Sequence, residues 1–391
     1  MLIVSSSAVA RPGWKRDLDG VMRNKPMGLH VRADGKTLYS WAAEKKRVPA
    51  SNQKLLLSMA LLDRLNPNTR LTTSALGRRV RSGTLGGNLF VVGRGDPTFT
   101  SGGSFSRSLP FRPSYLGRLA KKIKASGVRR IQGRVVGAQT HFAHDWWAPG
   151  WKSTFPSTYV ALPAALNLDG NIRKGRHISN PEFRVADKLT KRLRSIGVRV
   201  SGGPKAGGPP PDYARKLVAE VRSPRLASMM RFMNRQSSNY FAEVFGKLLS
   251  VQRSGPLGTI AKGALGIKAW AARYNVNLAA HDASGLSSSN RVSPRALTRL
   301  LGIAHNQSWG ARLRSTLPTG GEGTLEDRLH GVRVRAKTGT LTGVSALSGW
   351  VRLKRAKTWA EFSILSRGMS KANAVKIEDR IVRLLRKRAR P

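Results

Sequence analysis

Ser51 and Lys54 are the first residues whose types and spacing suggest chemistry, because they stand three positions apart where a loop passes into an apolar run. If a helix begins here, the hydroxyl and the amine share a face. Serine requires a neighbouring base, and lysine can act as one if burial or a nearby cation lowers its pKa from about 10.4. A helix N-terminus also favours the negative charge of an acyl oxygen. The pair indicates acyl transfer, although Ser51 alone would more simply be a helix cap.

Two later tripeptides make acyl transfer the stronger interpretation. Ser237 to Asn239 lies in a break between two expected helices, and Lys337 to Gly339 lies in an expected strand. Taken singly, the first could cap a helix and the second could be a lysine that protects a strand edge. Each motif nevertheless stands in the structural context that its chemistry would need. The three motifs together are specific.

In this order, the motifs resemble those of the penicillin-binding, active-site serine D-Ala-D-Ala peptidases. The resemblance is closest to the low-molecular-mass class C branch, the D-alanyl-D-alanine carboxypeptidase and endopeptidase family. It covers nearly the whole chain, since matching segments are also found at Pro49–Asn52, Gly93–Pro97, Asp282–Ser287, Gly323–Leu325 and Ala336–Leu341.

The resemblance implies a catalytic role for several residues. Ser51 would attack the carbonyl between two D-alanines, with Lys54 as the general base, although the base in this superfamily is disputed. Ser237 would relay a proton to the leaving group, and Asn239 would hold the substrate amide and Lys54. Lys337 would take part in the site as a like charge that lowers the pKa of Lys54.

The same resemblance implies a substrate-binding strand. The ammonium of Lys337 and the hydroxyl of Thr338 would bind the terminal carboxylate of the substrate. Gly339 would leave an open backbone along which a peptide tail can lie as an added strand. The backbone N–H groups of Thr340 and Ser51 would form an oxyanion hole, which is typically worth about 3–4 kcal/mol per donor. Asp282 is expected to order its loop, and Ser284 and Gly285 to shape a turn.

The fold that the resemblance implies is of the α/β (α+β) class, a β-lactamase/transpeptidase-like antiparallel sheet flanked by helices and split by an inserted α/β domain. Residues 11–66 and 223–391 would form the peptidase domain, and residues 67–222 the insert. The further β-rich module of the family is expected to be missing or reduced near residues 168–181. Expected helices are 51–65, 115–126, 181–197, 225–234, 240–252 and 371–388; expected strands are 84–92, 134–138, 198–200, 333–340, 345–353 and 359–366, with a hairpin at 28–41 and a surface turn at 202–211.

Composition limits the partners of this 391-residue chain. Lysine and arginine number 70 against 20 acidic residues, which gives a formal charge of +50 that repels itself unless something anionic is close. The basic residues are spread along the chain and no nucleic-acid-binding motif is present. An anionic wall polymer therefore fits the charge as well as nucleic acid does. A coding bias towards arginine would explain the charge equally well. Because the chain contains no cysteine, disulfides and thiolate chemistry are excluded. Its seven histidines are scattered and form no zinc motif, so no metal is expected, nor any other cofactor.

Residues 1–10 end in a small-x-small pattern that resembles the end of an export signal, and no apolar run reaches the ~20 residues of a membrane span. The sequence therefore predicts an exported serine D-Ala-D-Ala carboxypeptidase or endopeptidase that cleaves peptidoglycan stem peptides through a Ser51 acyl-enzyme and is inhibited by β-lactams. A β-lactamase or esterase on the same scaffold is the alternative enzyme. A non-catalytic, cationic wall-binding protein is the alternative of another class.

Overall fold

An antiparallel sheet of five strands joins the two ends of the chain. The computed structural model describes residues 12–390. The strand order is β14-β15-β16-β1-β2, so the N-terminal hairpin pairs with a C-terminal strand, from Met27 opposite Ser366 to Ala33 opposite Ala360. The predicted hairpin and all three C-terminal strands are confirmed. Their bounds are β1 (Met27–Ala33), β2 (Lys36–Trp41), β14 (Val334–Leu341), β15 (Val344–Arg352) and β16 (Trp359–Arg367).

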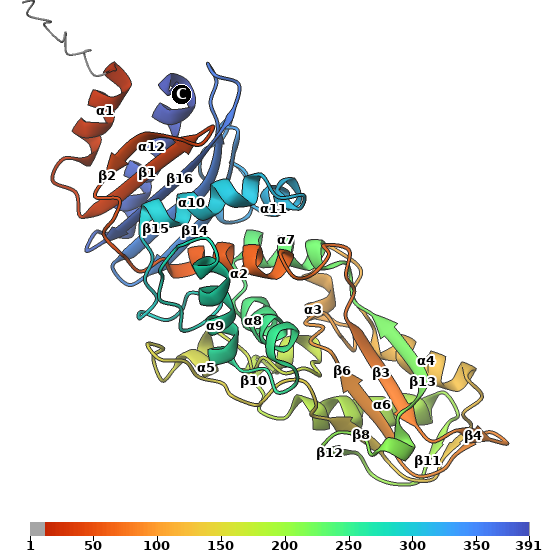
Figure 1. The fold of residues 1–391 in the computed structure, drawn as a ribbon. Coiled ribbons are helices and arrows are strands. Elements are labelled where there is room, and N and C mark those ends of the chain that lie inside the picture. The colour runs from red at the N-terminus through yellow and green to blue at the C-terminus, as the bar shows by residue number, and fades with distance from the viewer. Residues whose placement is uncertain (1–11, 391) are drawn as a thin grey trace, which may run out of the picture.

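Helices cover both faces of this sheet (Figure 1). Alternate side chains of β15 enter different cores: Leu347 and Val351 pack with α1 (Gly13–Met22) and α12 (Lys371–Arg388). Ala346 and Trp350 belong to the core that contains α10 (Pro294–His305). This period of two is what a strand buried on both faces requires. The prediction of an antiparallel sheet flanked by helices is confirmed.

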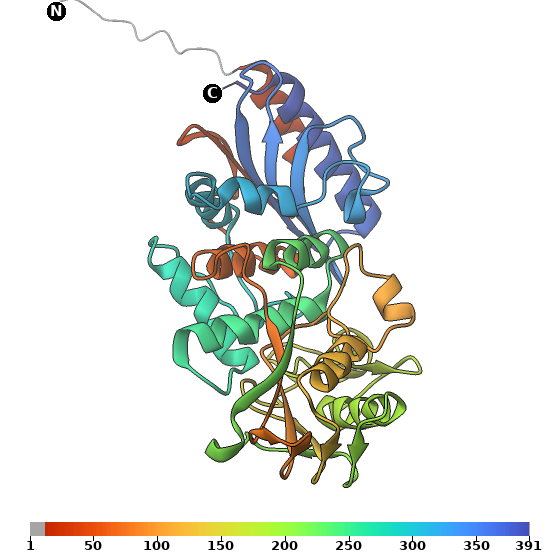
Figure 2. The ribbon, with the colours of Figure 1, turned by 90° about the vertical axis from the view of Figure 1, so that its right-hand side faces the viewer.

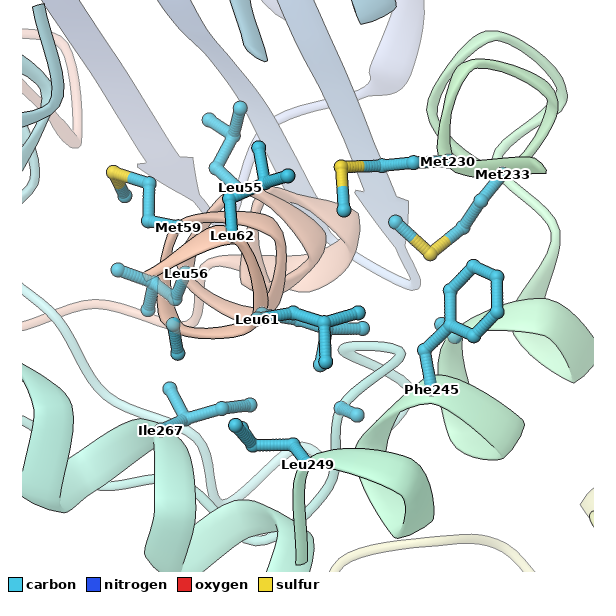
Figure 3. Packing of buried hydrophobic residues seen from close by; sticks show 14 of the residues in the cluster. Leu55, Leu56, Met59, Leu61, Leu62, Met230, Met233, Phe245, Leu249 and Ile267 are labelled. Atoms are coloured by element: carbon cyan, nitrogen blue, oxygen red, sulfur yellow. The ribbon is translucent and has the colours of Figure 1, made fainter. Parts of the chain in front are cut away.

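A fully buried helix, α2 (Gln53–Leu62), lies between the sheet and a helical layer. All ten of its residues are buried, because it is apolar on every side after its first turn. Figure 3 shows its leucines among side chains of α7, α8 and α9. The predicted helix from residue 51 to 65 is confirmed in its centre, but the chain enters it through a 3-10 turn, η1 (Ala50–Asn52). The surrounding helices are α7 (Leu226–Gln236), α8 (Asn239–Ser254), α9 (Ile260–Ala272) and α11 (Gly310–Thr316).

The chain between α2 and α7 forms a second layered region, the lower part of Figure 1, which Figure 2 shows from the side. Its larger sheet has the order β12-β8-β6-β3-β13 and mixes parallel and antiparallel pairs. The long helices α4 (Leu116–Ala125) and α6 (Pro181–Ser195) share its core. The sheet strands are β3 (Thr72–Gly77), β6 (Leu89–Gly93), β8 (Val135–Ala138), β12 (Lys205–Gly207) and β13 (Lys216–Arg222).

Short elements complete this region. They are the strands β4 (Val80–Arg81), β5 (Thr84–Leu85), β7 (Arg130–Ile131) and β11 (Arg199–Val200), the hairpin β9 (Ile172–Arg173) and β10 (Arg176–His177), the helices α3 (Ser104–Arg107) and α5 (Phe155–Thr158), and the 3-10 turns η2 (Asp169–Asn171) and η3 (Asp212–Ala214). A further 3-10 turn, η4 (Gly323–Leu325), precedes β14.

Two expectations about local structure were wrong, and one helix was missed. The expected strand at 84–92 is two strands, because Gly87 has a positive φ of 80° and breaks it. The expected surface turn at 202–211 contains β12, which pairs with β8. Helix α9 was missed because it contains glycines; a Cβ on Gly263 would lie 2.5 Å from the carbonyl oxygen of Gly246, so glycine there permits close contact with α8.

The segment for which export was predicted, residues 1–10, lies outside the described residues. Among residues 12–390, no helix combines the length and the apolar character that crossing a membrane requires.

Candidate active site

Ser51 lies in the 3-10 turn between the loop after β2 and the buried helix α2. The preceding residue, Ala50, has a positive φ of 45°, so the chain bends sharply just before Ser51. The neighbouring Asn52 donates from Nδ2 to Ser348 Oγ of the inner strand β15 at 2.8 Å, which fixes the turn to the sheet. Ser51 itself is only partly buried. Its hydroxyl is therefore positioned by rigid elements and is still accessible.

Lys54 is 0% exposed, and its ammonium nitrogen is held by three oxygen atoms. Nζ lies 3.0 Å from Ser51 Oγ, 2.9 Å from Asn239 Oδ1 and 2.6 Å from the carbonyl oxygen of Ser284. Burial lowers the pKa of Lys54 to about 7, although the charges of Asp282 and Glu243 act in the opposite direction. A substantial fraction of this lysine is neutral near pH 7 and can accept a proton from Ser51.

The break between α7 and α8 brings the second motif to the same place. Ser237 ends α7 in a left-handed conformation with φ 55°. The middle residue, Ser238, caps α8 by accepting a hydrogen bond from the N–H of Phe241 at 3.3 Å. Because Ser238 acts as the cap, Ser237 and Asn239 on either side are left to contact the lysines of the site.

Lys337 in β14 is the second fully buried lysine of the site. It donates to Ser237 Oγ and to the carbonyl oxygen of Thr338, both at 2.9 Å. Burial and, to a smaller extent, the charge of Lys54 hold the pKa of Lys337 well below its ordinary value. The side chain of Thr338 donates to Thr324 Oγ1 at 2.7 Å, which connects β14 to η4.

Two glycines allow the backbone segments of the site to meet. A Cβ on Gly339 would lie 2.8 Å from the carbonyl oxygen of Pro49 and 3.1 Å from the backbone nitrogen of Ser51. A Cβ on Gly285 would lie 1.9 Å from the carbonyl oxygen of Ala50. Strand β14 therefore runs directly beside Ser51, and Thr340, one residue further, is exposed. The structure brings the residues named from the sequence together around Ser51.

The loop at Asp282 contributes more than the sequence indicated. Asp282 orders it as expected: the buried carboxylate accepts hydrogen bonds from the N–H groups of Gly285 and Ser287 at 2.9 and 2.8 Å. It also accepts from Trp151 Nε1 at 2.8 Å, although Trp151 belongs to the chain between α2 and α7. Because Ser284 in this loop presents its carbonyl oxygen to Lys54, Trp151 supports the site through two intermediates.

Glu243 was missed by sequence reasoning. It is 0% exposed on α8, and its Oε1 accepts from the N–H groups of Ala283 and Ser284 at 3.1 and 2.7 Å. Burial, and secondarily the charge of Asp282, raises the pKa of Glu243 to about 8. A carboxylate within an apolar helical stretch was the available signal, because acids are almost never fully buried without partners.

Lys54 brings an amine of lowered pKa within hydrogen-bonding distance of the Ser51 hydroxyl and the Asn239 carboxamide, and the second amine, that of Lys337, is hydrogen-bonded to Ser237. A serine paired with a base of lowered pKa is equipped for nucleophilic attack on an acyl carbon. Among residues 12–390, no three histidine, aspartate or glutamate side chains are grouped to hold a metal ion.

Comparisons with known proteins agree with this geometry. A D-alanyl-D-alanine carboxypeptidase of Actinomadura sp. (strain R39) is 27% identical, over 94% of this chain and 83% of its own length. Carboxypeptidase DacB of Mycolicibacterium smegmatis is also 27% identical, over 92% of this chain and 82% of its own length. The crystal structure of penicillin binding protein 4 (dacB) from Haemophilus influenzae has the same fold, with a TM-score of 0.80 at 20% identity, covering 95% of this chain and 99% of that chain.

Family membership rests on a match along nearly the whole chain. The model of the D-Ala-D-Ala carboxypeptidase 3 (S13) family matches residues 18–176 and 172–388. The resemblance inferred from the three motifs is thereby confirmed, as is the expected fold class. The chain belongs to the D-Ala-D-Ala carboxypeptidase 3 (S13) family.

Proposed function

We propose that this protein hydrolyses the D-Ala-D-Ala bond of peptidoglycan stem peptides, or the equivalent cross-link, through an acyl-enzyme on Ser51. The observation that carries this is the placement of Lys54 Nζ between Ser51 Oγ and Asn239 Oδ1, with a pKa of about 7. Neutral Lys54 takes the Ser51 proton while Oγ bonds to the acyl carbon. The leaving amine departs with a proton relayed through Ser237, and water then hydrolyses the ester.

The substrate tail binds along β14 in this proposal. β14 is the last strand in the order of its sheet. Because the N–H of Ala336 already donates to the carbonyl oxygen of Pro318 at 3.1 Å, an extended peptide would pair with the edge beyond Ala336. The ammonium of Lys337 and the hydroxyl of Thr338 bind the terminal carboxylate, which favours the protonated form of Lys337. The backbone N–H groups of Ser51 and Thr340 stabilise the oxyanion, and the close approach at Gly339 supports this pairing of β14 with the Ser51 turn.

Covalent labelling with a fluorescent penicillin tests the nucleophile. Ser51→Ala should abolish the label, because no oxygen remains to form the ester. Ser126→Ala, which removes a hydroxyl at the end of α4, should be labelled like the wild type. Labelling that persists in Ser51→Ala would refute the proposal.

The lifetime of the penicilloyl adduct separates a peptidase from a β-lactamase or esterase. A peptidase should keep the adduct for many minutes, whereas a β-lactamase should release it rapidly. Digestion of a defined muropeptide dimer, followed by mass spectrometry, then distinguishes loss of a terminal D-alanine from cleavage of the cross-link. Failure to cleave either bond, combined with absence of labelling, would favour a non-catalytic wall-binding protein.

The location and organisation of the protein are part of the same proposal. Members of this family act on the cell wall, which supports export of the chain, with anionic wall polymers as additional partners. Residues 67–222 would be an insert in a peptidase domain of residues 11–66 and 223–391. A further module would be missing or reduced near residues 168–181; the alignment to the Actinomadura relative extends over 466 residues, more than this chain contains, which supports that loss.

A further inference from the structure

A basic cavity is lined by residues of α1, β2 and α12, three elements that meet at the end of the first sheet remote from α2 (Figure 1). It has a volume of about 830 Å³ and is formed where α1, β2, the β15–β16 loop and the end of α12 come together. Six of its lining residues are basic: Lys15, Lys36, Arg355, Lys387, Arg388 and Arg390. The other lining residues are Pro12, Gly13, Trp14, Thr37 and Leu38, none of which is acidic.

Little negative charge compensates these six cations. Within residues 12–390, one ion pair involves a basic residue of the cavity: Arg388 contacts Asp17 at 2.5 Å. Lys15 lies 5.5 Å from the ring centre of Trp14, an aromatic contact that does not neutralise it. Lys36 and Lys387 are exposed at the rim. The cavity therefore keeps a concentrated positive potential, which concave surfaces strengthen.

The preference of helix C-termini for basic residues explains only part of this positive charge. Basic residues are favoured in the last turn of a helix, which accounts for Lys387 and Arg388 in α12. Lys15, Lys36 and Arg355 come from three other elements that have no such preference at these positions. The first turn of α1 also faces the cavity, without a side-chain cap, and helix N-termini favour anions. Four separate parts of the chain thus supply positive charge to one concave surface.

We propose that this cavity binds the phosphate groups of a linear phosphodiester polymer of the bacterial cell wall. Its volume falls in the range of sites for ligands of drug size, about 300–1,000 Å³, so it can hold several phosphate groups. Lysine and arginine are the usual side chains for phosphate recognition. The choice of a wall polymer over a nucleic acid rests on the proposed function. The site would tether the enzyme to the wall while the Ser51 face stays free.

A charge-matched comparison tests the proposal. One variant carries Lys36→Glu and Lys387→Glu at the cavity rim. The control carries Lys121→Glu and Lys188→Glu, which change the net charge equally but lie on exposed faces of α4 and α6. Binding of fluorescently labelled poly(glycerol phosphate) and of a short DNA duplex is measured by anisotropy at low salt for both variants and the wild type. Penicillin labelling and thermal unfolding show that each protein is folded.

The cavity variant should bind poly(glycerol phosphate) at least about tenfold more weakly than the wild type, because several phosphate contacts become repulsive. The control should lose less than about threefold. Equal losses in both variants would show that binding depends on diffuse charge and would overturn the proposal. A loss confined to DNA would overturn it in favour of a nucleic-acid site. Penicillin labelling is read separately, so failure here leaves the Ser51 assignment intact and failure there leaves the cavity intact.

Discussion

Lysines in two regions of this molecule illustrate opposite uses of the same side chain. At the Ser51 site, Lys54 and Lys337 are 0% exposed and burial lowers their pKa values. At the α1/α12 cavity, Lys36 and Lys387 are exposed to solvent. Lys54, with a pKa of about 7, can exchange protons near neutral pH, whereas the solvated lysines supply positive charge. In a chain of charge +50, burial and not residue type determines whether a lysine can transfer protons or only attract anions.

The buried lysines are tolerated because oxygen atoms surround them. Lys54 has three acceptors, and the loop that supplies one of them is held by the side chains of Asp282 and Glu243. Leaving a charged group buried without such partners would cost several kcal/mol. The solvated lysines at the cavity need no such support, since water provides it.

The sharpest test of this contrast is Lys54→Met, which keeps the length of the side chain but removes the amine. Acylation of Ser51 by a fluorescent penicillin should slow by about a thousandfold, within the range expected for loss of a general base. Lys121→Met on the exposed face of α4 should leave the rate unchanged. A Lys54→Met protein that is acylated within tenfold of the wild-type rate would show that the buried amine is not the base.

Added salt should weaken binding at the basic cavity but leave the Ser51 site almost unchanged. Raising the salt concentration from low to physiological should weaken retention on purified cell walls by about a hundredfold, because bound counterions compete with the solvated cations. The acylation rate should change by less than about twofold, since the buried lysines are shielded from added ions. Wall retention that is independent of salt would remove the electrostatic part of the comparison.

The residues that form the site could be predicted because each motif coincides with a change of local structure. A loop becomes the apolar helix α2 at Ser51, two helices are interrupted at Ser237, and an alternating strand contains Lys337. The hairpin at β1 and β2 and the final helix α12 were equally readable from their periodicity. In these places the local pattern and the tertiary structure agree.

The rest could not be read because its signals depend on tertiary contacts. The carbonyl oxygen that Ser284 offers to Lys54 belongs to the backbone and leaves no mark on the sequence. The hydrogen bond from Trp151 to Asp282 joins segments 131 residues apart. Helix α9 depends on glycine for contact with α8, although glycine disfavours helices in isolation. The residues that line the basic cavity come from four separate parts of the chain, so no single stretch of sequence predicts it.

Trp151→Phe tests whether the supports of the buried lysine matter. The ring is kept, but the hydrogen bond to the buried carboxylate of Asp282 is lost, at a typical cost of about 1–3 kcal/mol. We expect acylation to slow by about tenfold, because the Ser284 carbonyl oxygen that holds Lys54 becomes less well positioned. Trp147→Phe, at a tryptophan that is 54% exposed in the same segment, is the matched control. Equal rates for the two variants would mean that the segment between α2 and α7 does not support the site.

Glu243→Gln should reveal the buried acid through the pH dependence of stability. The pKa of Glu243 is 4.5 when unperturbed and about 8 in the fold, so between these values the folded protein retains a proton that the unfolded chain has released. This group therefore makes the wild type less stable as pH rises from 4.5 to 8.

In the Glu243→Gln variant, glutamine can still accept from the same two N–H groups but does not titrate. The melting temperature of Glu243→Gln relative to wild type should be higher at pH 8 than at pH 5, by a few degrees. Glu326→Gln, at an exposed position, serves as the control. Equal differences at the two pH values would show that Glu243 is ionised in the fold, which would place an additional negative charge beside Lys54 and weaken the contrast between its buried, neutralisable amine and the solvated lysines of the cavity.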